Sequence, residues 1–249
     1  MFSGFLGDRM LGGEVLANMS LLVACYVYVL LIIVISGKMD SILQISRKSS
    51  RKFLHAMIGN LPFVIPFFSY NSFPLNFPFL VAAPFVFVTF LASPYSPSKR
   101  ISEKMKGLAD ISEEGHQLGL VFYAVSYTFL ALFFSAKPYV IAAGVLPMAY
   151  GDASASLVGE KYGKRRYRIF ADKSLEGSVA MFLVSFLGFV VSLVFFSGLY
   201  SFSVFDMLFA AFAVALVATL AEASSPLGVD NITVPVLSAL VFLLLSGGL

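Results

Sequence analysis

Long apolar stretches separated by short charged segments are the feature that most limits how this chain can fold. Of its 249 residues, 59% are hydrophobic and only 12% are charged, a balance far outside that of soluble domains. A helix needs roughly 17–25 predominantly apolar residues to cross a bilayer. We therefore predict an all-α fold, a polytopic membrane helix bundle that forms a single integral membrane domain over residues 1–249.

The charged or Pro/Gly-rich flanks of the apolar stretches mark about eight transmembrane helices. A total of about seven stays open, because two neighbouring stretches, 53–69 and 76–93, can instead form one re-entrant hairpin. Pro62, Pro84 and Pro147 interrupt some stretches, which membrane helices tolerate where neighbours satisfy the freed carbonyls. The predicted spans are 15–36, 53–69, 76–93, 118–136, 139–158, 178–198, 204–222 and 232–247.

Basic residues are concentrated in the segments that follow the first, third and fifth predicted spans. Of the 17 Lys and Arg residues, only Arg9 and Lys137 lie elsewhere. The positive-inside rule makes the side that holds these segments cytoplasmic. We therefore predict a multi-pass protein of the cell membrane with both termini outside and its active-site loops in the cytoplasm. The alternative is that these cations only fix the topology and contact anionic lipid headgroups.

The first cluster with possible chemistry is RKFLH, at the mouth of the second span. On a helix Arg51 and His55 share one face, with Lys52 beside them, which suits a phosphate or a lipid headgroup. A topogenic basic pair followed by an interfacial histidine is the alternative. The second cluster is Glu113, Glu114 and His116 before the fourth span. It can hold a metal, or its acids can simply stabilise a helix start.

The third cluster runs from Gly151 to Gly177 as GDASASLVGEKYGKRRYRIFADKSLEG. Asp152, Ser156 and Glu160 are spaced by four residues and form one polar stripe on a helix. An unpaired acid at the end of an apolar helix is costly, so Asp152 is a functional candidate. A purely structural polar loop between helices is the alternative. Two glycines, Gly159 and Gly163, are predicted to release this helix into a basic loop.

The end of the same cluster predicts a phosphate-binding helix start. Ser174 is a potential cap, and free amides at a helix N-terminus favour phosphate. The spacing is not that of a P-loop. The predicted nucleotide-binding residues are Ser156, Gly159, Lys161, Gly163, Lys164, Lys173, Ser174 and Gly177.

The fourth cluster, AEASSPLGVDN, joins the last two spans. Glu222, Asp230 and Asn231 offer hard oxygen donors of the kind that Mg²⁺ prefers. Glu222 is unfavourably placed at the end of a helix, which predicts a positive partner, either a metal or a lysine.

Together these motifs resemble the CTP-dependent polyprenol kinases, which include dolichol and phytol kinases and a diacylglycerol kinase. The likeness covers residues 51 to 235 and rests on RKFLH, on GDASASLVGEKYGK followed by DKSLEGS, and on AEASSPLGVDNITVPV. It implies CTP as phosphate donor, Mg²⁺ as cofactor and a long-chain lipid alcohol in the bilayer as acceptor. The residues that match the family's motifs are Arg51, Lys52, Asp152, Gly159, Lys173, Ser174, Gly177, Asp230 and Asn231.

The mechanism expected from this resemblance is phosphoryl transfer, which depends on positioning and charge neutralisation. The predicted metal ligands are Asp152, Glu222, Asp230 and Asn231. Arg51, Lys52 and Lys173 are predicted to neutralise the phosphates, and His55 or a carboxylate is predicted to take the hydroxyl proton.

Three other functions stay open at this point. The related phosphatidate cytidylyltransferases would make a CDP-lipid, and a kinase of the same family can act on an isoprenoid monophosphate. A lipid transporter or flippase is a more distant possibility. No nucleic-acid partner is predicted, and the sequence leaves the acceptor's identity and the oligomeric state open.

Overall fold

The computed structural model describes residues 2–43, 46–100, 118–226 and 228–247. These residues form helices together with only two small antiparallel hairpins, so the predicted all-α class is confirmed. The predicted cluster of Glu113, Glu114 and His116 lies outside the described residues.

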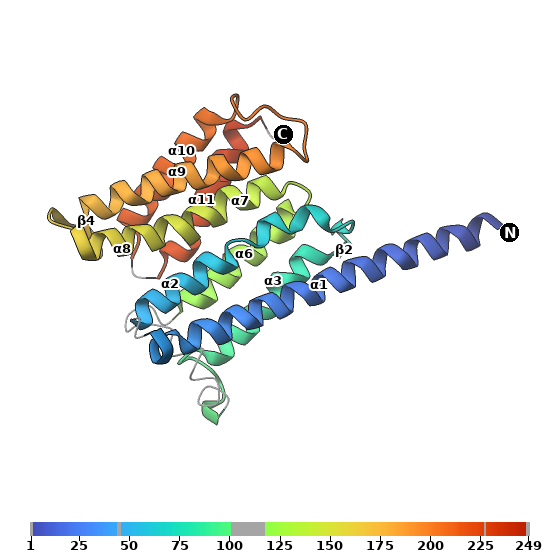
Figure 1. The fold of residues 1–249 in the computed structure, drawn as a ribbon, viewed down its shortest axis with the longest axis horizontal. Coiled ribbons are helices and arrows are strands. Elements are labelled where there is room, and N and C mark those ends of the chain that lie inside the picture. Colours follow the sequence, from blue (N-terminus) through green and yellow to red (C-terminus); the bar gives the residue numbers. More distant parts are fainter. Residues whose placement is uncertain (1, 44–45, 101–117, 227, 248–249) are drawn as a thin grey trace.

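The first part of the chain builds one side of the bundle (Figure 1). Two 3₁₀ turns, Leu61–Phe63 and Ile65–Phe67, and the hairpin β1 (Asn71–Ser72) with β2 (Leu75–Asn76) connect its second and third helices. Its helices are α1 (Phe2–Leu43), α2 (Arg47–Ile58), α3 (Phe77–Ala92) and α6 (Gly119–Phe134).

The rest of the chain builds the other side, which carries the polar motifs. A π-helical segment, Pro147–Gly151, joins the first two of its helices into one continuous rod. The hairpin β3 (Arg166–Arg168) with β4 (Asp172–Ser174) follows that rod. The helices are α7 (Pro138–Leu146), α8 (Asp152–Tyr162), α9 (Leu175–Ser197), α10 (Leu208–Ser224) and α11 (Asp230–Leu245).

Among the described residues, three helices are long and apolar enough to cross a membrane: Gly12–Met39, Pro138–Tyr162 and Leu175–Ser197. Four shorter apolar helices, α3, α6, α10 and α11, fall on four of the other five predicted spans. The protein is therefore an integral membrane protein with several apolar helices. The exact number of spans stays a prediction.

The predicted span 53–69 is not one continuous helix, as the prolines within it predict. Its helical part, α2, begins six residues earlier at Arg47 and ends at Ile58, followed by the two 3₁₀ turns. Prolines at 62 and 66 supply no backbone N–H, which favours this break. The end of α2 also lies close to the π-helical segment, because a Cβ added at Gly59 would collide with the Ala149 side chain. Only glycine allows α2 to pass the π-helical segment at this distance.

Two prolines inside helices are each compensated by a hydroxyl from a neighbouring helix. Proline lacks an N–H, so the carbonyl four residues earlier loses its donor. Pro84 affects the carbonyl of Leu80, which accepts a 2.6 Å hydrogen bond from the Tyr26 hydroxyl. Pro235 likewise leaves the carbonyl of Asn231 without its donor within the helix. The expectation that neighbours satisfy freed carbonyls is confirmed at Pro84.

The charged segments gather at one end of the bundle. Figure 1 shows the start of α2, the β3–β4 hairpin and the α10–α11 connection at that end. The N and C marks lie away from it. Helices that run back and forth thus bring motifs from distant parts of the sequence to one place.

Candidate active site

A polar cavity of about 210 Å³ lies at the charged end of the bundle, between α2, α8, α9, α10 and α11. The structure brings together most of the residues that the sequence singles out. The ones that line the cavity are Arg51, Lys52, Asp152, Ser156, Gly159, Lys173, Ser174, Gly177, Glu222 and Asp230.

Five of the predicted site residues are not among the residues that line this cavity. Lys161 and Lys164 are exposed, and Gly163 caps the end of α8. His55 is buried on α2, and its ring stacks on Tyr123 with centroids 4.6 Å apart. Asn231 is buried next to Asp230, behind the cavity wall.

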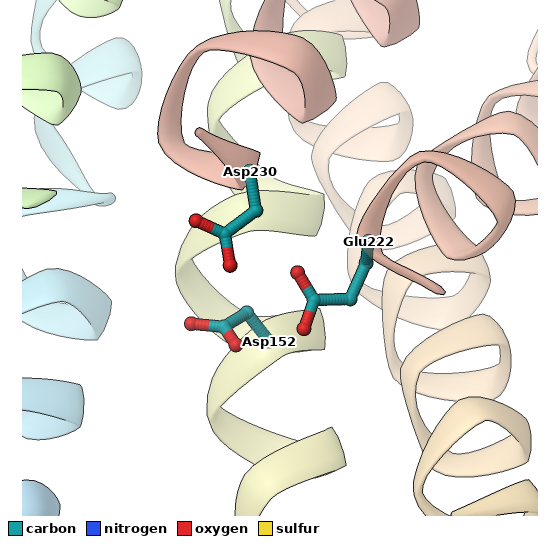
Figure 2. Close-up of side chains that lie close together, drawn as sticks. All are labelled: Asp152, Glu222 and Asp230. Atoms are coloured by element: carbon teal, nitrogen blue, oxygen red, sulfur yellow. The ribbon is translucent and has the colours of Figure 1, made fainter. Parts of the chain in front are cut away.

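Three buried carboxylates form the centre of the site. Figure 2 shows Asp152, Glu222 and Asp230 pointing toward one another from α8, α10 and α11. One oxygen from each lies within 4.8 Å of the others. Buried like charges at this separation repel strongly, so the cluster requires cations to balance it.

Two lysines supply part of that balance. Lys52 forms an ion pair and hydrogen bond with Asp152, and Lys173 does so with Glu222. The positive partner predicted for Glu222 is therefore a lysine. Burial alone would lower the pKa of the Lys173 ammonium. The charges of Glu222, Asp152 and Asp230 outweigh this effect and hold the pKa of Lys173 above its ordinary value. Lys173 is thus a permanent cation in the cavity wall.

The donor atoms around the carboxylates fit a hard divalent cation. Among the described residues, Glu222 Oε2 and Asn231 Oδ1 are buried acceptors without a hydrogen-bond partner. Buried acceptors are almost always satisfied in proteins. Carboxylate and amide oxygens are the donors that Mg²⁺ prefers, so these residues fit the predicted metal.

Asp152 directly follows the π-helical segment Pro147–Gly151. Pro147 supplies no N–H to the preceding turn, which favours a local change of helical pitch. Such π segments are frequent at functional sites, because they turn the next side chain away from its regular direction. Beyond this point Asp152 and Ser156 line the cavity from one helical face, as their spacing predicts.

The start of α9 closes the other side of the cavity. Ser174 caps the helix by accepting a 3.1 Å hydrogen bond from the Gly177 N–H, as predicted. A Cβ added at Gly159 would lie only 2.9 Å from the Ser174 hydroxyl, and one at Gly177 only 2.7 Å from the Ala155 carbonyl. The two glycines thus allow α8 and α9 to pack closely.

The prediction that Gly159 releases the helix is wrong. The helix continues to Tyr162 and ends at Gly163. Gly159 is used instead for the contact between α8 and α9, because a side chain there would strike the Ser174 hydroxyl. Small residues such as glycine let the backbones of membrane helices approach closely.

Two residues that were not predicted from the sequence donate hydrogen bonds to the backbone of site residues. The Tyr123 hydroxyl donates to the His55 carbonyl at 3.3 Å, beneath the stacked rings. The Ser126 hydroxyl donates to the Asn231 carbonyl at 2.8 Å and so replaces the donor that Pro235 lacks. The proline four residues after Asn231 is a sequence signal for such a partner, although it does not identify Ser126.

The apolar helices and the buried charges at one end of the bundle define an integral membrane protein with a polar cavity. Comparison with known proteins gives the family. The chain is 42% identical over 129 residues to the phytol kinase of Synechocystis sp., covering 51% of this chain and 54% of that relative. It is 31% identical over 207 residues to the probable chloroplastic phytol kinase 2 of Glycine max, covering 81% and 66%. The corresponding protein of Oryza sativa subsp. japonica is 29% identical over 206 residues, covering 78% and 65%.

The chain belongs to the phytol kinase family. It spans about half of the length of the Synechocystis relative and just under two thirds of the two plant relatives. No family model matches the chain. No solved structure matches it.

Proposed function

We propose that this protein transfers a phosphoryl group from CTP to an isoprenoid alcohol of the phytol type, forming the lipid monophosphate with the help of Mg²⁺. One observation carries the proposal: three buried carboxylates, two lysines and a capped helix start meet in one cavity at the charged end of an apolar bundle. The acceptor class follows the relatives named phytol kinase, and CTP follows the resemblance of the motifs.

The metal ligands in this proposal are Asp152, Glu222, Asp230 and Asn231. When bound, Mg²⁺ would neutralise phosphate oxygens as negative charge develops during transfer. The unpartnered oxygens of Glu222 and Asn231 support this assignment. Asn231 would contribute by completing the donor set from behind the cavity wall.

The cations Arg51, Lys52 and Lys173 would bind the phosphates of CTP. Arg51 and Lys52 approach from α2, while Lys173 approaches from β4 on the opposite wall. Cations on both walls hold a phosphate chain in line with an incoming hydroxyl, and positioning is the main demand of this reaction. The free N–H groups at the start of α9 would bind a further phosphate oxygen.

In the transfer step, the acceptor's hydroxyl oxygen forms a bond to the γ-phosphorus, and the bond from that phosphorus to the β-phosphate oxygen breaks. CDP leaves with the bonding electron pair, and the hydroxyl proton passes to a base. We assign the base to the carboxylates rather than to His55, because the carboxylates line the cavity and His55 does not. A base must lie within hydrogen-bond reach of the proton it takes.

In the membrane, this function places the charged end of the bundle at the cytoplasmic surface, where CTP is available. About eight spans with both termini outside would satisfy the positive-inside rule. The position of the N and C marks away from the charged end in Figure 1 supports this arrangement. Labelling of cysteines introduced at Ser201, between α9 and α10, and at Lys164 by a membrane-impermeant thiol reagent in intact cells tests it, with Ser201 expected to react and Lys164 not. The wild-type Cys25 is buried.

Purified protein with γ-³²P-labelled CTP, Mg²⁺ and phytol tests the function. We expect labelled phytyl monophosphate and unlabelled CDP in equal amounts. Labelled pyrophosphate and a CDP-lipid, formed when phytyl monophosphate is supplied as acceptor, would show a cytidylyltransferase instead. Labelled product only from phytyl monophosphate would show a kinase of the later step. Transport of lipid without consumption of CTP would refute the proposal.

A further inference from the structure

A second cavity of about 50 Å³ lies on the other side of α2 from the polar cavity. Its wall is almost entirely hydrocarbon and aromatic, with residues from α1, α2, α3 and α6 and the first 3₁₀ turn. A dry apolar cavity is an unusual feature in a close-packed bundle, and apolar cavities bind apolar ligands. The site described above does not use it.

Helix α2 connects the two cavities. Arg51 and Lys52 line the polar cavity, while Leu54 and Ile58 of the same helix line the apolar one. At 1.5 Å per residue, these two residues lie about 4 and 10 Å along α2 from Arg51. The Ser36 hydroxyl donates to the Ser50 carbonyl at 2.7 Å, which holds α1 in this register. The apolar cavity therefore lies about one to two helical turns along α2 from the phosphate-binding cations.

The stacked pair of His55 and Tyr123 joins the helix that reaches both cavities to the wall of the apolar one. His55 follows Lys52 on α2 by one turn, and Tyr123 lines the apolar cavity. The rings are 4.6 Å apart with planes inclined by 13°. A flat aromatic wall of this kind suits an alkyl chain that leaves a polar site.

The cavity opens toward the membrane. Most residues in its wall are buried, but Ile33 of α1, Ile58 of α2, and Phe85 and Thr89 of α3 are partly exposed. Three of these four residues lie on α1 and α3, so we place the opening between these two helices. Since α1 contains the long apolar segment Gly12–Met39, a chain that leaves through this opening enters lipid.

We infer that this cavity holds the part of the acceptor's hydrocarbon chain next to its hydroxyl. This inference rests on the proposed function. The hydroxyl reaches the polar cavity past His55 and Tyr123, and the rest of the chain leaves between α1 and α3. One water-sized group needs about 10–15 Å³ of such space, so the cavity takes about three to five carbon groups, or roughly one isoprene unit. Acceptor selection thus depends on the structure of the first isoprene unit and not on total chain length.

An acceptor panel tests the selectivity. We expect phytol, geranylgeraniol and farnesol to be phosphorylated with similar kcat/KM, because they share a branched unit next to the hydroxyl. A straight-chain alcohol of similar length should be a poorer substrate, by about tenfold, since one misplaced methyl or methylene changes discrimination by that order. A steady dependence on total length, with no preference for the branched unit, would overturn the inference.

Filling the cavity tests its location. Ala124→Leu and Ala82→Leu add bulk from two different walls, and we expect each to raise the KM for phytol about tenfold. The KM for CTP should stay within about twofold, because neither residue lines the polar cavity. Ala17→Leu, on the exposed face of α1, is the matched control. Thermal unfolding of each variant separates a filled cavity from a misfolded protein.

Photolabelling gives a readout that does not depend on turnover. A phytol analogue with a diazirine near its hydroxyl should label α1, α3 or α6 around the cavity, and excess phytol should compete. Ala124→Leu should abolish this label. Labelling confined to the outer face of α9 would overturn the inference even if the kinase is active. If wild-type protein phosphorylates no alcohol but labels at the cavity, the proposed function fails and the lipid site stands.

Discussion

The two sides of the bundle differ in how their apolar helices are packed. In the most apolar stretch of Pro138–Tyr162, 72% of the residues are buried, against 28% in that of Gly12–Met39. All nine residues of α7 are buried. The carboxylates lie beyond α7, with Asp152 at the start of α8, Glu222 near the end of α10 and Asp230 at the start of α11. Helix α9, on the polar side, is itself only 33% buried in its most apolar stretch. The contrast is therefore between the central rod and the outer helices, and the α1 side contains the apolar cavity.

The difference shows what each side requires. Carboxylates and lysines can be buried only if their partners are held in place, because a displaced partner leaves a buried charge uncompensated. Close contacts at Gly159 and Gly177 supply that rigidity. An apolar chain needs only a space of suitable shape and a route to lipid. The predictions below test this contrast, beginning with the largest expected effect.

Asp152→Asn should reduce turnover by about three orders of magnitude, the loss typical for removal of a preorganised charged group from an active site. It removes a proposed metal ligand and the partner of Lys52. Turnover with phytol at saturating Mg²⁺ is the measurement. Asp206→Asn, an exposed acid outside the site, should have normal activity. Near-normal turnover in Asp152→Asn would contradict the assignment of the site.

Lys173→Met should reduce turnover by about 100-fold and also lower thermal stability, because it leaves Glu222 buried without its cation. Breaking a buried pair costs about 3–5 kcal/mol. The double variant Lys173→Met with Glu222→Gln should recover most of the stability and none of the activity. Recovery of both, measured by thermal unfolding and CTP turnover, would mean that the pair is only structural.

Ser126→Ala should lower turnover several-fold and raise the Mg²⁺ concentration needed for half-maximal activity. The Asn231 carbonyl would lose its donor, at a cost of about 0.6–1.7 kcal/mol, and a proposed metal ligand would be less well positioned. Pro235→Ala restores a backbone N–H to that carbonyl. Ser126→Ala should therefore cost less in the Pro235→Ala background, and equal costs in both backgrounds would contradict this coupling.

Tyr26→Phe, on the α1 side, is the counterpart of Ser126→Ala. Of these variants it should have the smallest effect on turnover. It removes the hydroxyl that satisfies the Leu80 carbonyl, which Pro84 leaves without a donor. We expect a stability loss of about 0.6–1.7 kcal/mol with kcat and the Mg²⁺ requirement unchanged. A change in the Mg²⁺ requirement as large as that of Ser126→Ala would mean that the structure of the α1 side also affects metal binding in the polar cavity.

Local rules account for much of the fold and part of the site. The apolar stretches predict the helices, and a spacing of four predicts the common face of Asp152 and Ser156. The Ser174 cap also follows from sequence. The use of Gly159 for packing does not follow, because it depends on which backbone passes nearby.

The sequence by itself determined that this chain is an apolar helical bundle and which short segments carry its charges. These properties depend on the chemistry of single residues and on neighbours within a helical turn. Only the tertiary structure decided which charged residues pair with one another. Lys52 and Asp152 are separated by 100 residues, and Lys173 and Glu222 by 49. Such pairs form only after the helices pack, and close packing is set by small residues whose contacts a linear pattern does not contain.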